Sequence, residues 1–255
     1  MCGIIAAASN RNVGKLLVQG LHKMEYRGYD SAGIALHQKD QIAHLRTLGK
    51  VKLLEEKMIA EKPKSKLGIA HTRWATHGEP SEENAHPHKS NERVYIVHNG
   101  IIENYLDLKE FLKDEGYSFS SQTDSELIAH LLEYFLSKGN SMIDSMYLTK
   151  EKLDGAYAIA AIDRENDQNI VIARSKSPLL IGIGTDEFLA ASDPLAIGQL
   201  TNEFIFLEDG DVAELTSESY TIFDDTKQKV SREITHIAVS YKHLTLPTIL
   251  LVYLW

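Results

Sequence analysis

Cys2 is the residue best suited to covalent chemistry, because it carries the only thiol in the 255-residue chain. A small side chain in the second position permits removal of Met1, which would leave the thiol beside a free α-amine. An α-amine has a pKa of about 7.7–8, so part of it is neutral near pH 7 and can accept the thiol proton. The alternative is that Cys2 is a small buried hydrophobic residue, and this residue alone leaves both interpretations open.

Polar side chains that could surround such a nucleophile are concentrated between positions 71 and 98. Five of the chain's 11 histidines lie in this interval: His71, His77, His86, His88 and His98. A metal site is one interpretation, but the sequence contains no HExxH motif and no closed set of Cys and His ligands. We therefore expect these histidines to form hydrogen bonds around a polar pocket, and we expect neither a metal nor a cofactor.

Five ordered sequence strings carry a specific resemblance: CGI at 2–4, EYRGYDSAG at 25–33, HTRWATHGEPSEENAHPH at 71–88, HNGIIENY at 98–105 and TDSELIAH at 123–130. Together they closely resemble the glutaminase domain of the glutamine–fructose-6-phosphate aminotransferase (isomerising) family, which belongs to the class II glutamine amidotransferases. The similarity extends from Cys2 to about Thr226. The resemblance implies the N-terminal nucleophile hydrolase fold, an α+β four-layer αββα sandwich with two antiparallel sheets between helical layers.

The resemblance also implies a reaction, the hydrolysis of L-glutamine to L-glutamate and ammonia through a thioester on Cys2. In the family, the ammonia converts fructose 6-phosphate to glucosamine 6-phosphate in a C-terminal sugar-isomerase domain. We expect that domain to be absent from this chain, so that fructose 6-phosphate is a partner only through the missing part. The full-length family enzyme is expected to be homo-oligomeric.

Three residues near Cys2 acquire roles by the same resemblance. Cys2 would attack the substrate carboxamide, and its α-amine would pass the thiol proton to the departing ammonia. The side-chain NH2 of Asn99 and the backbone N–H of Gly100 match the family's oxyanion hole, although this pair alone would indicate a hairpin turn. Arg27 matches a supporting residue near the nucleophile, and a purely structural ion pair is an equally open role for it.

The residues that match the family's glutamine-binding positions are centred on Arg73. Arg73 matches the arginine for the substrate α-carboxylate, a bidentate contact that suits a guanidinium. Thr76 and His77 match neighbouring polar contacts to the same group. Asp124 matches the partner of the substrate ammonium, with a place in the first turn of a helix as its alternative. Trp74 belongs to a family loop that closes over glutamine, and its alternative is core packing.

Hydrophobic periodicity indicates the elements that must position these residues. Residues 3–8 form a short apolar run typical of a buried strand, and residues 13–24 show the i, i+3, i+4, i+7 spacing of an amphipathic helix. Two more helices are predicted, one at 105–112 and one after a capping-box pattern at 123–126. Short strands are predicted at 32–36, 41–45, 67–71, 94–97, 157–162, 170–173, 179–183, 187–191, 204–207, 212–215 and 220–223. Consecutive strands in this number favour α+β with antiparallel sheets.

Composition restricts the partners and the compartment. The chain has 27 basic and 36 acidic residues and a net charge of −9, which argues against a general nucleic-acid binder. A single cysteine cannot form an internal disulfide, and the first residues lack the basic segment of a secretory signal, so we expect a cytoplasmic protein. We expect residues 2–238 to be the amidotransferase domain. Residues 239–255 form an unmatched hydrophobic tail that is a poor membrane span, and we interpret it as non-native.

Three alternatives remain at this point. Another class II amidotransferase, of the amidophosphoribosyltransferase or asparagine synthetase type, would use the same Cys2 chemistry, although the strings at 25–33 and 71–88 favour the hexosamine enzyme. A catalytically inert partner or regulatory module would share the fold without the activity. An aggregating fragment is the third, since the apolar tail could disturb the last strand.

Overall fold

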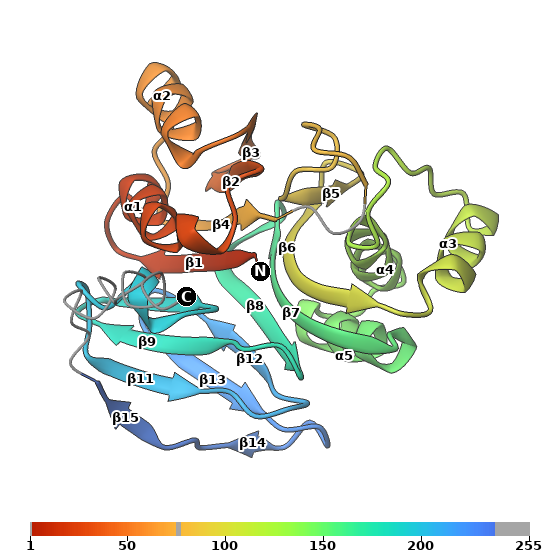
Figure 1. The fold of residues 1–255 in the computed structure, drawn as a ribbon. Helices are drawn as coiled ribbons and strands as arrows, with labels where there is room; N and C mark the ends of the chain where they lie inside the picture. The colour runs from red at the N-terminus through yellow and green to blue at the C-terminus, as the bar shows by residue number, and fades with distance from the viewer. Residues whose placement is uncertain (1, 75–77, 238–255) are drawn as a thin grey trace, which may run out of the picture.

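Two antiparallel sheets form the centre of the protein in a computed structural model, which describes residues 2–74 and 78–237 (Figure 1). The first sheet has the strand order β15 (Ile234–His236), β11 (Glu203–Phe206), β9 (Leu180–Gly184), β10 (Glu187–Ala191), β1 (Gly3–Ser9), β4 (Leu67–Arg73), β2 (Ser31–Gln38) and β3 (Gln41–Leu48). The second has the order β14 (Lys229–Val230), β13 (Tyr220–Phe223), β12 (Val212–Leu215), β8 (Asn166–Ser175), β7 (Gly155–Asp163), β6 (Val94–Ile102) and β5 (His88–Ser90).

The alternation of side chains along β1 shows how the sheets are stacked. Ile4, Ala6 and Ala8 belong to an apolar cluster shared with the second sheet, whereas Ile5 and Ala7 belong to a cluster shared with helices. Successive side chains of a strand point to opposite faces, so β1 is covered on both sides. This explains why its sequence is a continuous apolar run without polar alternation.

Helices cover the outer face of each sheet and complete four layers (Figure 1). The helices α1 (Gly14–Met24) and α2 (Val51–Glu61) pack on the first sheet, and α4 (Glu126–Ser137) and α5 (Met142–Lys152) pack on the second, with α3 (Tyr105–Asp114) beside α4. Two short 3-10 helices, η1 (Glu25–Arg27) and η2 (Pro194–Ala196), lie in connections. The predicted α+β fold, an αββα sandwich of two antiparallel sheets, is confirmed.

The capping box predicted for α4 is wrong. The helix begins at Glu126, and the residue before it, Ser125, makes no side-chain capping bond. Thr123, the predicted cap, contacts the ring nitrogen Nε2 of His88 through its hydroxyl at 3.0 Å. The Glu126 carboxylate is turned back toward the preceding segment, where it accepts hydrogen bonds from Ser120 and Ser121.

Two helices were not predicted. The helix α2 buries only Val51 and Leu54, so its sequence lacks a wide apolar stripe. The helix α5 has a recognisable start that the periodicity does not reveal: the Ser141 side chain caps it by accepting a hydrogen bond from the Asp144 backbone N–H at 3.1 Å.

The tail predicted to be non-native, residues 239–255, lies outside the described residues. In the part of the chain that the structure describes, no helix has the length and apolar character needed to cross a bilayer.

Candidate active site

The candidate site forms where the start of β1 meets the end of β4. Antiparallel pairing sets Gly3 opposite Thr72, so the chain that leaves β4 passes beside Cys2. The backbone N–H of Trp74 donates a hydrogen bond to Cys2 Sγ at 3.3 Å, and Sγ lies 3.6 Å from the Trp74 carbonyl oxygen. Residues 72 positions apart are therefore held in contact by the register of two strands.

Burial is the main influence on the Cys2 thiol, and it raises the pKa of that thiol above its ordinary value. The hydrogen bond from Trp74 and the charge of Arg73 lower the same pKa but have smaller effects. The thiol is therefore protonated at neutral pH. A proton acceptor must act before the sulfur can attack a carbonyl carbon.

Asn99 and Gly100 lie inside β6, where they pair with Ala158 and Tyr157 of β7, so the hairpin-turn alternative is wrong. The Asn99 side-chain Nδ2 donates a hydrogen bond to the Cys2 carbonyl oxygen at 3.1 Å. Gly100 has a φ of +142°, and a Cβ there would lie 1.9 Å from the Ala156 carbonyl oxygen. Only glycine fits this backbone, which keeps the strand close to its neighbour at the site.

Arg73 and Asp124 bring opposite charges to the same region, and both side chains are buried. The Arg73 guanidinium donates to the backbone carbonyls of Gly78 at 3.3 Å and Glu79 at 3.4 Å. One Asp124 oxygen, Oδ2, accepts a hydrogen bond from the Ile102 backbone N–H at 2.8 Å. Asp124 precedes α4 by two positions, so the alternative that places it in the first helical turn is wrong. Its carboxylate instead bonds to the end of β6.

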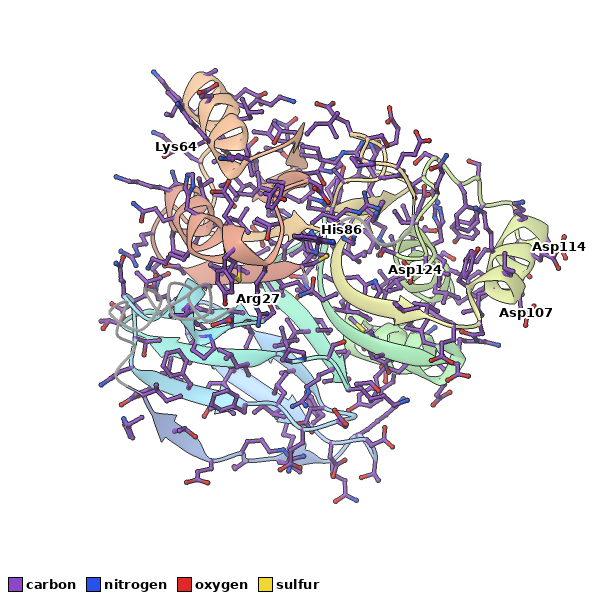
Figure 2. The ribbon with its side chains drawn as sticks, in the orientation of Figure 1. Arg27, Lys64, His86, Asp107, Asp114 and Asp124 are labelled. Carbon is purple, nitrogen blue, oxygen red and sulfur yellow. The ribbon has the colours of Figure 1, made fainter. Side chains whose placement is uncertain are left out.

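Trp74 is 44% exposed and contacts Tyr29 edge-on with a ring-centroid distance of 5.6 Å, so core packing is not its role. Arg27 forms the ion pair that was open as its alternative, with Asp193 at 3.1 Å, and also donates to the Ser192 carbonyl at 3.4 Å. Figure 2 labels Arg27, His86 and Asp124; His86 and Asp124 line the cavity described below, and Arg27 is not among its lining residues. The remaining predicted contacts, Thr76 and His77, lie outside the described residues.

The four described histidines of the 71–98 interval form hydrogen bonds inside the protein. His98 Nδ1 lies 2.8 Å from the Ser125 hydroxyl, and the His86 ring accepts a hydrogen bond from the His98 backbone N–H at 3.3 Å. Burial lowers the pKa of His88 to about 3, so its ring is neutral at pH 7. Among residues 2–74 and 78–237, no group of three or more His, Cys, Asp or Glu side chains is arranged to hold a metal ion.

These segments enclose a cavity of about 30 Å³. Its lining combines predicted residues with others that the sequence had not singled out: Cys2, Arg73, Trp74, His86, His98, Gly100, Thr123, Asp124 and Ser125. Thr123 and Ser125 were missed because they were interpreted as part of a helix start. Their positions on either side of Asp124 were the signal that could have found them. A cavity of this size holds about one water molecule.

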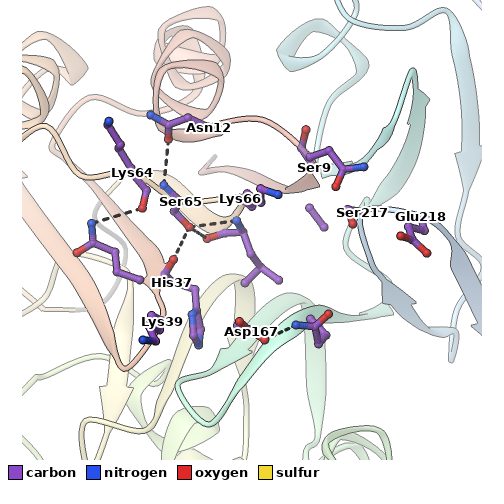
Figure 3. Close-up of a pocket in the computed structure, with 15 residues that line it drawn as sticks. Ser9, Asn12, His37, Lys39, Lys64, Ser65, Lys66, Asp167, Ser217 and Glu218 are labelled. Carbon is purple, nitrogen blue, oxygen red and sulfur yellow. Dashed lines mark hydrogen bonds between the residues drawn. The ribbon is translucent and has the colours of Figure 1, made fainter.

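A larger cavity of about 620 Å³ lies at the other end of β1 (Figure 3). Its lining includes Ser9, the last residue of β1, together with Ser65, Lys66 and Asp167. None of the site residues predicted from the sequence lines it, and it contains no thiol. The larger cavity therefore shares no lining residue with the cavity at Cys2.

Comparisons with solved structures identify the fold. The chain is similar to a glutamine phosphoribosylpyrophosphate amidotransferase from B. subtilis, with a TM-score of 0.76 and 24% identity over 88% of this chain and 49% of that one. It is also similar to a structure described as the allosteric regulatory enzyme of purine biosynthesis, with a TM-score of 0.74 and 26% identity over 91% and 49% of the two chains. These likenesses agree with the N-terminal nucleophile hydrolase fold of class II amidotransferases.

Sequence comparisons are more specific. The family described as "Glutamine amidotransferase domain" matches residues 71–199, just over half of the chain. Glutamine–fructose-6-phosphate aminotransferases [isomerizing] from Vibrio parahaemolyticus and Haemophilus influenzae are each 50% identical over 236 residues, which is 92% of this chain and 38% of theirs. The chain thus spans little more than a third of the length of these relatives. It belongs to the glutamine amidotransferase domain family.

Proposed function

We propose that this domain hydrolyses L-glutamine to L-glutamate and ammonia through a thioester on Cys2. The observation that carries the proposal is the convergence of Cys2, Arg73, Gly100 and Asp124 on one cavity. A nucleophile, a cation for a carboxylate, an anion for an ammonium and a backbone donor are the groups that a bound glutamine requires. Identity of 50% to the aminotransferases favours the hexosamine-type enzyme over the structurally similar purine-pathway enzyme, which would share the Cys2 chemistry.

The first half of the reaction uses the two ends of Cys2. Once Met1 is removed, the free α-amine takes the thiol proton while the sulfur attacks the carboxamide carbon of glutamine. The resulting oxyanion accepts hydrogen bonds from the Asn99 side-chain NH2 and the Gly100 backbone N–H. The protonated α-amine of Cys2 then gives its proton to the leaving nitrogen as the carbon–nitrogen bond breaks. Ammonia departs and leaves the thioester on Cys2. Water attacks the thioester next, which releases glutamate and the thiol.

Substrate orientation is assigned to the charged pair around the cavity. Arg73 binds the α-carboxylate of glutamine and Asp124 binds its α-ammonium, with Thr76 and His77 as further polar contacts. Trp74 closes over the bound substrate and excludes water. Arg27 supports the nucleophile at a distance: it holds Ser192, whose hydroxyl accepts a hydrogen bond from the backbone N–H of Ile4 at 3.0 Å.

The ammonia is proposed to react with fructose 6-phosphate in the portion of the relatives that this chain does not span, to give glucosamine 6-phosphate. Support comes from the relatives' names and from the 38% of their length that the chain covers. We place the full-length protein in the cytoplasm as a homo-oligomer, and we propose no cofactor, metal or nucleic acid for the glutaminase reaction.

Release of ammonia from L-glutamine tests the proposal. We expect wild type with Met1 removed to release ammonia and Cys2→Ala to release none, with equal thermal unfolding of the two proteins as the control for folding. If folded wild type lacking Met1 releases no ammonia, the domain is an inert module. If Cys2→Ala retains the wild-type rate, the nucleophile is assigned to the wrong residue.

A further inference from the structure

A buried histidine next to Asn99 has a proton position that the surrounding atoms determine. His71 lies in β4 and is fully buried, and its Nε2 is 3.2 Å from the His98 carbonyl oxygen. A backbone carbonyl can only accept a hydrogen bond, so Nε2 must carry the ring proton. The Asn99 side-chain atom that lies 2.9 Å from the same Nε2 must then also be an acceptor, which is Oδ1. The amide of Asn99 is thereby oriented.

The other end of the same amide reaches Cys2. With Oδ1 on His71, the NH2 group of Asn99 faces the Cys2 carbonyl oxygen and donates to it at 3.1 Å. A flipped amide would place its NH2 against the N–H of His71 and its oxygen against the Cys2 carbonyl. Both contacts would become repulsive, because each would join two donors or two acceptors. Two hydrogen bonds therefore select one orientation.

His71 remains a neutral donor over the working pH range of most enzymes. Burial lowers the pKa of His71 to about 3, and the positive charge of Arg73 acts in the same direction. Its ring stacks on His86 with a centroid distance of 4.1 Å, which holds the ring plane. Among the described residues, His71 Nδ1 has no hydrogen-bond partner, so the contacts of Nε2 alone set the ring's tautomer.

We propose that His71 is a positioning residue that holds the Asn99 amide with its NH2 directed toward the Cys2 end of the site. This inference rests on the proposed function, in which Asn99 donates to the oxyanion. It assigns His71 no contact with glutamine. A loss of His71 should therefore lower kcat for glutamine hydrolysis, where the oxyanion forms, and leave KM nearly unchanged.

Three substitutions separate the donor from the size of the side chain. We expect His71→Leu, which removes the donor, to lower kcat about tenfold, the size expected for one lost hydrogen bond. We expect His71→Gln, whose amide nitrogen occupies the place of Nε2, to recover most of that loss. His71→Asn carries its nitrogen at the place of Nδ1 and should lose kcat as Leu does. The comparison of Gln with Asn keeps the proposal testable if the Leu variant does not fold.

A double-mutant cycle with Asn99→Ala tests whether His71 acts through Asn99. We expect His71→Leu to lower kcat in wild type and to change it less than twofold when Asn99 is already alanine. The matched control is His37→Leu, because His37 is also buried and its ring contacts a backbone carbonyl, that of Arg164, at 2.9 Å. His37 lines the larger cavity at the other end of β1, and its loss should leave kcat within twofold of wild type.

The outcomes distinguish a failure of the positioning role of His71 from a failure of the proposed function. If His71→Leu and Asn99→Ala each lower kcat but their effects multiply independently, or if Gln rescues no better than Asn, the positioning role is overturned while the proposed function stands. If Asn99→Ala leaves kcat unchanged, the oxyanion role of Asn99 fails, and the inference about His71 fails with it. A non-additive cycle with rescue by Gln supports both.

Discussion

The surroundings of the Cys2 thiol determine its protonation state. Burial raises the pKa of the thiol and outweighs the hydrogen bond from the Trp74 backbone N–H, which lowers it, so the thiol is protonated at rest. A protonated thiol reacts slowly with chance electrophiles in water. In the proposed reaction, the attached α-amine would remove the proton when glutamine is aligned.

Substitution of Asp124 tests whether this residue contributes to substrate binding or to folding. We expect Asp124→Asn to raise KM for glutamine about 10- to 100-fold, because a charge-assisted hydrogen bond to the ammonium is lost. Asparagine retains an oxygen to accept the Ile102 N–H, so thermal stability should change little. Steady-state kinetics and thermal unfolding check the two parts. An equal loss of binding and stability would return Asp124 to a structural role.

Gly100 is the position where backbone geometry leaves no alternative residue. We expect Gly100→Ala to lower the free energy of unfolding by more than about 2 kcal/mol, because its φ is positive and its Cβ would collide with the Ala156 carbonyl. Urea denaturation measures the loss. Gly116→Ala is the matched control, since Gly116 also has a positive φ but meets nothing within 4 Å. A similar loss in both variants would show that the collision is unimportant.

A nucleophilic role for Cys2 was one of two interpretations that the sequence left open, and the neighbours of Cys2 could not be derived from local patterns. Asn99 is 97 positions away and was identified only through a family resemblance. Taken alone, Asn99-Gly100 indicates a hairpin turn, whereas the structure places the pair within β6. Pairing with β7 places these residues in a strand and not in a turn, and this pairing cannot be predicted from a short segment of sequence.

At the scale of elements, the segment before α4 is held by the helix that follows it. Both oxygens of the Glu126 carboxylate accept hydrogen bonds, Oε1 from the backbone N–H and hydroxyl of Ser120 and Oε2 from those of Ser121. Burial by itself would raise the pKa of Glu126, but the interactions with His130, Ser120 and Ser121 outweigh it and hold this pKa well below its usual value. The turn so fixed leads directly to Asp124 in the cavity lining.

Neutralising this carboxylate should disturb both stability and substrate binding. We expect Glu126→Gln to lower the free energy of unfolding by about 2 kcal/mol, because an amide offers one acceptor where the carboxylate offers two. We also expect KM for glutamine to rise, since the segment that carries Asp124 loosens. Exposed Glu110→Gln on α3 is the control and should change neither quantity. Unchanged KM in a destabilised Glu126→Gln would separate this turn from binding.

The elements themselves were predictable where periodicity was strong. The buried strand β1 and the amphipathic helix α1 follow their apolar patterns. The helix α2 escaped prediction because it buries only Val51 and Leu54. The start of α4 was predicted wrongly because the Glu126 carboxylate accepts hydrogen bonds from the turn at Ser120 and Ser121. The capping-box pattern does not predict these contacts.

Across the whole molecule, three apolar clusters hold the four layers of secondary structure together, and the described part of the chain also buries polar side chains. Several of those polar groups are neutral histidines. Burial lowers the pKa of His71 to about 3 and that of His44 to about 4, against an ordinary value of 6.5. The folded protein therefore keeps these histidines neutral below pH 6.5, where the unfolded chain would protonate them.

This burial predicts acid sensitivity. Below pH 6.5 the unfolded chain binds protons that the folded chain excludes, so the free energy of unfolding falls with pH, by up to about 1.4 kcal/mol per pH unit for each such histidine, down to the folded pKa. Urea denaturation between pH 7.5 and 4.5 measures the slope. His44→Gln keeps a donor for the Pro87 carbonyl but cannot titrate, so its slope should be shallower. An identical slope would mean that His44 does not contribute.

The central claim, that Cys2 is the nucleophile toward glutamine, is tested most directly by an electrophilic ketone analogue of L-glutamine and intact-mass measurement. The chain with Met1 removed should gain one label, peptide mapping should place it on Cys2, excess L-glutamine should slow its addition, and Cys2→Ala should remain unlabelled. A folded chain lacking Met1 that gains no label, or gains it on another residue, would contradict the account.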